Sequence, residues 1–178
     1  FIIIKNRYNK AMSYYAVDFG TSNSLLSYVS DSGVITPIPL DPVGGLVLRS
    51  LFYTPDKNQW YFGQNAIKHY VENEGSGRFF RSIKKFLPEP SYNGTIVHNR
   101  NLSIIDLVAV FLGEMKKRAD QHLGMNVERI ILGRPALYSL DKACDQLAED
   151  RMRKGAIQAG FKEVIFSVSG KGAWKWRY

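Results

Sequence analysis

The sequence predicts an α/β fold in which a five-stranded mixed sheet of order 3-2-1-4-5 carries an inserted α+β segment. Three observations lead to this prediction. The first forty residues contain three short strands in succession, residues 127–166 contain a strand, a helix and a strand, and a long segment of mixed pattern, residues 44–125, lies between them. The strand–helix–strand unit implies a right-handed crossover and a parallel pair. The chain has 178 residues, 45% hydrophobic and 13% aromatic, which is enough apolar material for one such core and excludes a disordered chain.

The amino-terminal strands alternate with turns. Residues 14–17 and 25–29 are rich in apolar and aromatic side chains, and the polar turn 18–24 separates them. A third strand, residues 34–40, contains two prolines and is expected at a sheet edge, because proline lacks the N–H that a ladder requires. The first forty residues should therefore form a three-strand meander.

The inserted segment is predicted to begin with a hairpin and to end with a long helix. Residues 46–53 and 60–62 flank the turn 55–58, and a short helix is expected over residues 64–72.

For the long helix, Ser103 and Asp106 have the spacing of a capping box, and Gly124 is typical of a helix end. Apolar residues recur at helical spacing between these two signals: Ile104, Val108, Phe111, Met115, Ala119 and Leu123.

The carboxyl-terminal part contains the strand–helix–strand unit. Residues 127–133 form a short apolar strand that an Arg-Pro pair closes, and Ser139 and Asp141 open a helix that extends to Gly160. Residues 163–166 form the last strand.

These elements divide the chain into a core, residues 12–43 and 126–167, and an inserted subdomain, residues 44–125. The segments outside this division, residues 1–11 and 168–178, have no acid and no pattern. We expect residues 1–11 to be a disordered or non-native leader and residues 168–178 to be a tail, both from translation outside the native frame. The alternative is that both ends are genuine and that the chain is a small stand-alone module.

The charge distribution bears on the class of partner. The chain carries 24 Lys and Arg against 16 Asp and Glu, a net charge of +8. Six of the bases lie in residues 1–11 and 168–178, so the rest of the chain has 18 bases against 16 acids. This near-neutral part does not predict a nucleic-acid partner. No apolar run reaches the length of a signal-peptide core or of a membrane span, and we expect no membrane partner.

The single cysteine, Cys144, excludes an intramolecular disulfide, and a reducing cytoplasm is the expected location. Cys144 lies among Ala143, Leu147 and Ala148 on the predicted helix, so we expect a core thiol.

The residues with most chemical content form the turn DFGTSNS, residues 18–24. Gly20 allows the backbone to approach a ligand, successive amides of such a turn form an anion-binding concavity, and Thr21 and Ser22 add hydroxyl donors. Asp18, at the end of a strand, is placed to hold a hydrated Mg²⁺ that bridges phosphate oxygens. The same composition is typical of a plain hairpin turn, and this alternative stays open.

Other nucleotide and metal motifs do not occur in the sequence. It contains neither Gly-x-Gly-x-x-Gly nor a Walker sequence, and its Asp-Phe-Gly tripeptide lacks the glycine-rich loop and catalytic loop of a protein kinase. His69, His98 and His122 are scattered, so no zinc site is predicted.

Four segments follow one another in the order of a known family. They are DFGTSNS at residues 18–24, SIKKFL at 82–87, IILGRPA at 130–136, and residues 152–166 with their Ala-Gly-Phe helix end. Together they resemble the nucleotide-binding domain of the heat-shock-70 (DnaK-like) chaperones, most closely the YegD-like branch. The family has the actin-like ATPase (ribonuclease H-like) fold, and the resemblance covers residues 13–166.

The resemblance implies that the chain is an ATP-binding lobe. Gly20, Thr21, Ser22 and Asn23 would contact the phosphates of ATP, and Asp18 would hold Mg²⁺ through water. The family's catalytic lysine matches Lys84, which would orient water or the γ-phosphate; Lys85 beside it is the weaker candidate. From its sequence context alone, Lys84 is a solvated lysine in a basic run, residues 81–85. The implied partners are nucleotide and, in the intact protein, unfolded polypeptides or a co-chaperone.

The sequence departs from the family pattern after the last strand. Ser169 stands where the family has a glutamate, and the second phosphate loop, the adenosine segment and the second lobe have no counterpart in the chain. The resemblance thus implies the amino-terminal lobe of a chaperone ATPase that does not hydrolyse ATP alone. An actin-like filament protein and a sugar-kinase-type lobe remain alternatives, and the long insertion 44–125 favours the chaperone.

Overall fold

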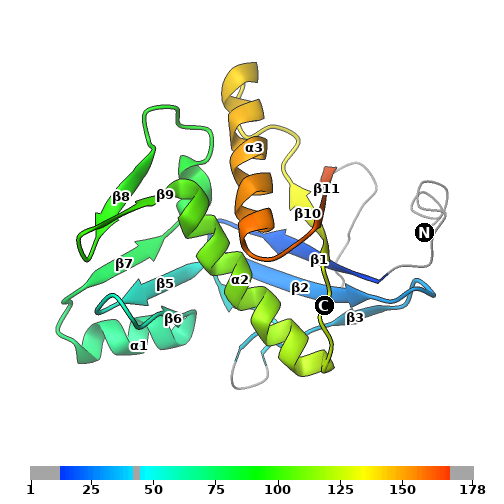
Figure 1. Cartoon of the computed structure of the whole chain (residues 1–178), viewed down its shortest axis with the longest axis horizontal. Helices are drawn as coiled ribbons and strands as arrows, with labels where there is room; N and C mark the ends of the chain where they lie inside the picture. Colours follow the sequence, from blue (N-terminus) through cyan, green and yellow to red (C-terminus); the bar gives the residue numbers. More distant parts are fainter. Residues whose placement is uncertain (1–12, 42–44, 169–178) are drawn as a thin grey trace.

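The computed structural model describes residues 13–41 and 45–168, which form eleven strands, three α-helices and one 3-10 helix. A six-stranded mixed sheet occupies the centre (Figure 1), with the order β11-β10-β1-β2-β3 and with β4 paired to β2. This order confirms the predicted 3-2-1-4-5 sheet and adds β4, which was not predicted. The strands are β1 (Tyr14–Phe19), β2 (Asn23–Val29), β3 (Ile35–Pro37), β4 (Leu48–Arg49), β10 (Arg129–Arg134) and β11 (Glu163–Val168).

The pairing of β1 with β10 unites the two ends of the described chain. The two strands run parallel, with Tyr15 opposite Ile130 and Val17 opposite Leu132. The third strand is shorter than expected, since only residues 35–37 of the predicted 34–40 pair with β2, and it lies at the sheet edge as its prolines required.

Two helices, α2 (Ile104–Leu123) and α3 (Lys142–Gln158), lie side by side over one face of this sheet (Figure 1). Gly155 of α3 permits their close approach, because a Cβ at this position would lie 2.4 Å from Cγ1 of Val108. On the sheet side, Phe19 of β1 packs on Phe111 of α2 with ring centroids 5.4 Å apart. The helices thus share one core with the sheet.

Local signals set the ends of these helices. The Ser103 side chain accepts from the Asp106 amide and the Asp106 carboxylate accepts from the Ser103 amide, which confirms the predicted capping box. Gly124 ends α2 in the left-handed conformation, with φ 66°. Asp141 caps α3 by accepting from the amide of Cys144. The expectation of a core thiol was wrong, since Cys144 in the first turn of α3 is only half-buried.

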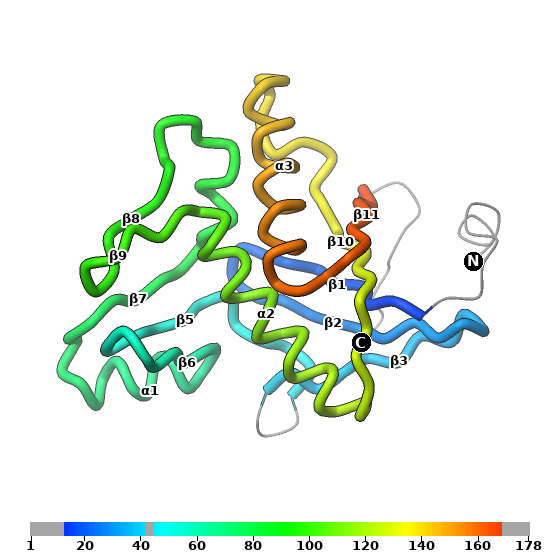
Figure 2. The backbone as a smooth tube through the Cα atoms, viewed as in Figure 1, coloured from blue at the N-terminus to red at the C-terminus, as the bar shows by residue number. Residues whose placement is uncertain are grey.

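A second, three-stranded sheet of order β6-β5-β7 and the helix α1 precede α2 in the chain. Figure 2 shows the chain passing from the central sheet into this second sheet and returning through α2. The predicted hairpin is confirmed by the pairing of β5 with β6, and the short helix has the predicted bounds. The elements are β5 (Leu51–Thr54), β6 (Tyr61–Phe62), α1 (Gln64–Glu72) and β7 (Arg78–Arg81).

The hairpin of β8 (Gly94–Val97) and β9 (Arg100–Ser103) was not predicted. Its two turn residues, His98 and Asn99, both have positive φ, 47° and 63°. Two-residue turns with positive φ usually contain glycine, which is the sequence signal for such a hairpin. Neither residue between these two strands is a glycine.

The aromatic residue Phe111 joins the two sheets. Its ring lies 5.4 Å from that of Phe19 on β1 and 5.9 Å from that of Phe52 on β5, and the side chain is fully buried. The helix α2, which the sequence assigned to the inserted subdomain, therefore packs on the central sheet as well. None of the helices in the described part of the chain is both long and apolar enough to cross a membrane.

We expect Phe111→Ala to lower the free energy of unfolding by about 3–5 kcal/mol, the usual cost of truncating a buried phenylalanine. The cost is large because the cavity opens where both sheets meet α2. Urea denaturation measures this loss of stability. The control is Ile96→Ala, because the Ile96 side chain is 72% exposed. A loss similar to that of the control would contradict the joining role of Phe111.

Candidate functional site

The turn between β1 and β2 places the predicted phosphate-loop residues at one end of the central sheet. Strand β1 alternates, so that Phe19 is buried in the core while Asp18 is exposed on the opposite face. Gly20 and Thr21 are half-buried, and Ser22 and Asn23 are exposed. The hydroxyl-bearing residues are therefore open to a ligand.

Gly20 is required by the tightness of this turn. A Cβ at Gly20 would lie 2.1 Å from the backbone oxygen of Asn23, closer than any real contact. The backbone thus folds back on itself directly above residue 20, so the turn itself requires the glycine, and the predicted approach of a ligand to Gly20 stays a prediction.

A serine that the sequence analysis did not single out fixes the turn from the side. The amide of Ser50 donates to the carbonyl of Ser22 over 2.8 Å, and the hydroxyls of Ser24 and Ser50 are also 2.8 Å apart. Both Ser24 and Ser50 are buried. The turn is therefore held in place by the β4–β5 segment and does not project freely from the sheet.

Lys84 comes to this turn from a distant part of the sequence. It lies on a 3-10 helix, η1 (Ile83–Phe86), and its Nζ donates to the carbonyl of Phe19 over 2.6 Å, across 65 residues of sequence. Asp18 influences the amine through its charge, without a direct ion pair between them. Lys85 beside it is exposed, so the structure brings Lys84, and not Lys85, to the end of β1.

Burial determines the electrostatics of Lys84. Removal of the amine from water lowers the pKa of Lys84 below the ordinary value of lysine, and the negative charge of Asp18 partly offsets this lowering. Only one of the three N–H donors of the ammonium is used by Phe19. The amine therefore keeps N–H groups that could donate hydrogen bonds to an anion.

Tyr138, which was not predicted, forms another wall of the site. Its ring centroid lies 5.8 Å from Nζ of Lys84 and 5.1 Å from the guanidinium carbon of Arg134. The hydroxyl is buried without a hydrogen-bond partner among the described residues, and burial raises the pKa of Tyr138 above the ordinary value of tyrosine. The Arg-Pro pair that closes β10 was the only local signal of this loop.

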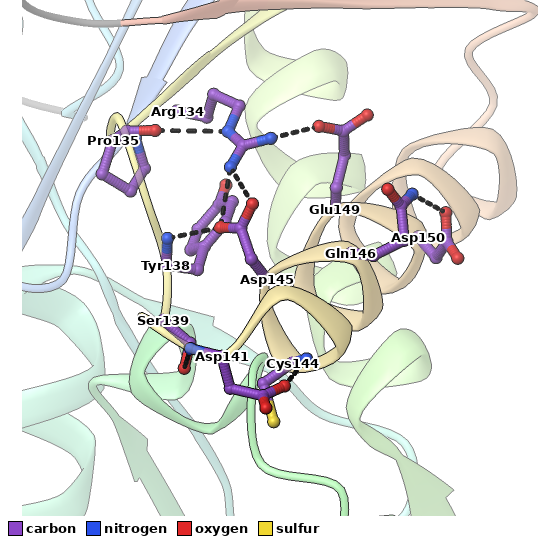
Figure 3. A network of polar contacts seen from close by, with 10 residues as sticks. All are labelled: Arg134, Pro135, Tyr138, Ser139, Asp141, Cys144, Asp145, Gln146, Glu149 and Asp150. Carbon is purple, nitrogen blue, oxygen red and sulfur yellow. Dashed lines mark hydrogen bonds and ion pairs between the residues drawn. The ribbon is translucent and has the colours of Figure 1, made fainter.

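A network of ion pairs holds the Tyr138 loop on α3 (Figure 3). Arg134 donates from Nη2 to both carboxylate oxygens of Asp145, each over 2.8 Å, and from Nη1 to Glu149. Asp145 also accepts from the amide of Tyr138 over 2.7 Å. Bidentate pairs of this kind fix orientation as well as distance, so the ring that contacts Lys84 has a defined position.

Strand β10 borders Asp18 at Gly133. A Cβ at Gly133 would lie 3.9 Å from Oδ1 of Asp18, which is an ordinary contact. No group of three or more His, Cys, Asp or Glu side chains that could hold a metal occurs in residues 13–41 and 45–168. Asp18 could hold a divalent cation only as a single carboxylate, with water or ligand oxygens completing the coordination.

The site thus joins a tight turn whose Ser22 and Asn23 side chains are exposed, one carboxylate and one half-buried ammonium, an arrangement able to bind an anion and a hydrated cation. Ser169 and the two terminal segments discussed above lie outside the described residues. No known family model matches the chain.

We expect Gly20→Ala to destabilise the protein by about 1–3 kcal/mol, because the added methyl overpacks the turn. The matched control is Gly133→Ala, whose closest contact would be 3.5 Å and which should change stability by about 0.5 kcal/mol or less. Thermal and urea unfolding compare the two. Equal effects would show that the turn relaxes freely.

The lowered pKa of Lys84 has a consequence for stability. Between this pKa and that of a free lysine, the unfolded chain binds more protons than the folded one, so the contribution of Lys84 to the free energy of unfolding rises with pH. We expect the difference in stability between wild type and Lys84→Met to shift in favour of the wild type as pH increases through that window. Urea denaturation at several pH values measures it. A difference for Lys84→Met that does not change with pH would contradict the burial of this amine.

Proposed function

We propose that this chain is the amino-terminal lobe of a DnaK-like (heat-shock-70) chaperone ATPase with the actin-like, ribonuclease H-like fold, and that it binds the phosphates of Mg-ATP at the β1–β2 turn. The observation that carries this proposal is the hydrogen bond from Nζ of Lys84 to the carbonyl of Phe19. Two segments that resemble functional parts of that family meet there, although 65 residues separate them.

The charges around the turn support an anionic ligand. The ammonium of Lys84 is bonded to a neutral carbonyl, and Asp18, whose negative charge acts on it, makes no ion pair with it. Half-burial strengthens the interaction of this amine with an anion relative to a fully exposed lysine, because the local dielectric constant is lower. Phosphate oxygens would accept hydrogen bonds from the remaining N–H groups of Lys84.

The proposed roles follow from what phosphoryl transfer requires, which is mostly positioning and charge stabilisation. The amides of the turn and the side chains of Thr21, Ser22 and Asn23 would bind phosphate oxygens. Asp18 would orient a hydrated Mg²⁺, which supplies positive charge to the phosphates when bound. Lys84 would orient water or the γ-phosphate.

These groups would contact the phosphates from one side only. In an open site, water weakens each charge interaction and is not excluded from the reaction. We therefore expect a dissociation constant for Mg-ATP of roughly 1 mM, or about −4 kcal/mol, and no hydrolysis above background.

The test is a titration of the purified chain with Mg-ATP, followed by the amide resonances of residues 18–24. We expect saturable chemical-shift changes at these amides. Lys84→Met should weaken the affinity that they report, with and without Mg²⁺, and Lys85→Met should leave it unchanged. Asp18→Asn should remove the effect of Mg²⁺ while leaving the binding of free ATP.

Three results would contradict the proposal. Absence of shifts at about 10 mM Mg-ATP, tenfold above the expected constant, would leave the turn as a plain hairpin. Phosphate release that depends on Asp18 would show a complete catalytic site. Pelleting of the chain that depends on Mg-ATP would favour the filament-forming alternative.

A further inference from the structure

The buried guanidinium of Arg151 has a coordination that the proposed site does not explain. Arg151 lies on α3, is only 7% exposed, and its Nη1 and Nη2 donate to backbone carbonyls of one loop. The acceptors are the carbonyls of Phe86 at 3.2 Å, Leu87 at 2.9 Å and Glu89 at 2.8 Å from Nη1, and of Tyr92 at 2.9 Å from Nη2.

In the described part of the chain, the charge of Arg151 has no carboxylate partner. Among residues 13–41 and 45–168, no Asp or Glu lies within ion-pair distance of it, whereas Arg153 on the same helix pairs with Glu149 over 3.3 Å. A buried cation is costly unless its donors are satisfied. Four carbonyl dipoles accept from the two Nη groups of this one, so the loop and the guanidinium depend on each other.

The segment that Arg151 holds has little stability of its own. η1 has only four residues, and the residue that precedes it, Ser82, is a non-glycine residue with φ 56°. Short 3-10 helices have poor hydrogen-bond geometry, and the carbonyls at a helix end need external donors. Arg151 supplies these donors at Phe86, the last residue of η1, and at Leu87, the residue after it.

The apolar contacts of η1 cannot replace these bonds. Ile83 and Leu87 are buried in the core and fix how deep the segment lies. Hydrophobic contact is not directional, however, and the direction of the intervening Lys84 side chain depends on the rotation of η1. Hydrogen bonds to carbonyls on its carboxyl-terminal side restrict that rotation.

We propose that Arg151 is a positioning residue, which clamps the loop 86–92 to α3 and thereby directs Lys84 to the carbonyl of Phe19 at the end of β1. The connection is short, since Arg151 bonds the carbonyls of Phe86 and Leu87, and the amide of Leu87 donates to the carbonyl of Lys84 over 3.3 Å. The importance of Lys84 for a ligand rests on the proposed function, but its placement does not.

The experiment compares three variants in the full chain without ligand. Arg151→Met removes the guanidinium, and Arg151→Lys keeps the charge but loses the planar fork that reaches several carbonyls. Arg153→Met is the matched control, because Arg153 lies on the same helix and donates to the carbonyl of Val164 on β11 over 2.7 Å, away from η1.

Two readouts separate positioning from stability. The first is the ring-current shift that Tyr138 imposes on the Lys84 Cε protons. The loss of this shift in Tyr138→Leu assigns it. We expect the shift to disappear in both Arg151 variants and to persist in Arg153→Met. The second is hydrogen exchange at the amides of Lys85 and Leu87, which bond the carbonyls of Ser82 and Lys84. Loss of several hydrogen bonds should accelerate it at least about tenfold in Arg151→Met, with little change at β1 amides.

A retained ring-current shift in Arg151→Lys and Arg151→Met would overturn the proposal. So would an equal acceleration of exchange at η1 and β1, since that reports only global destabilisation. If Arg151→Met does not fold, Arg151→Lys decides alone by the same two readouts. Failure of ATP binding in the wild type, with both expected results obtained, would contradict the proposed function and leave the role of Arg151 intact.

Discussion

The packing of Phe111 between the two sheets is the interaction on which the geometry of the site depends. One ring contacts Phe19 at the end of β1 and Phe52 in the middle of β5. Since β5 pairs with β7, and η1 follows β7 after one residue, the position of the second sheet decides where Lys84 can reach. The carbonyl that Lys84 bonds belongs to the same Phe19, so a core contact and a polar contact fix the same residue from two sides.

Local signals in the sequence were sufficient for five of the six strands of the central sheet and for the helices. Caps at Ser103 and Asp141 and the glycine at residue 124 define the helix ends, and the strand–helix–strand pattern implies the parallel pairing of β10 with β11. The sequence also indicated the turn 18–24, because its glycine and hydroxyl residues are adjacent. Such features depend on neighbours within a few residues, and they are therefore visible without the fold.

The parts that were missed depend on contacts between distant residues. The amide of Ser50 donates to a turn 28 residues earlier, and Arg151 donates to carbonyls about 60 residues earlier. No periodicity or spacing in the sequence indicates contacts between residues so far apart. The β8–β9 hairpin was missed for a different reason, since His98 and Asn99 adopt positive φ without a glycine. For Lys84, the residues alone favoured a solvated side chain, and only the resemblance assigned it a place at the turn.

Backbone carbonyls, where carboxylates would be usual, accept hydrogen bonds from two cations, the half-buried Lys84 and the buried Arg151. Lys84 bonds the carbonyl of Phe19 and Arg151 bonds four carbonyls of the following loop, whereas Arg134 is neutralised by Asp145 and Glu149. A carboxylate paired with Lys84 would stabilise the ammonium, but it would also compete with an incoming anion. A carbonyl orients the amine and leaves its charge uncompensated, at a cost in stability that burial imposes and that Asp18 only partly offsets. An arrangement that maintains a positive charge at some expense of stability is typical of a binding site, and this physical argument for a function at the β1–β2 turn is independent of any family resemblance.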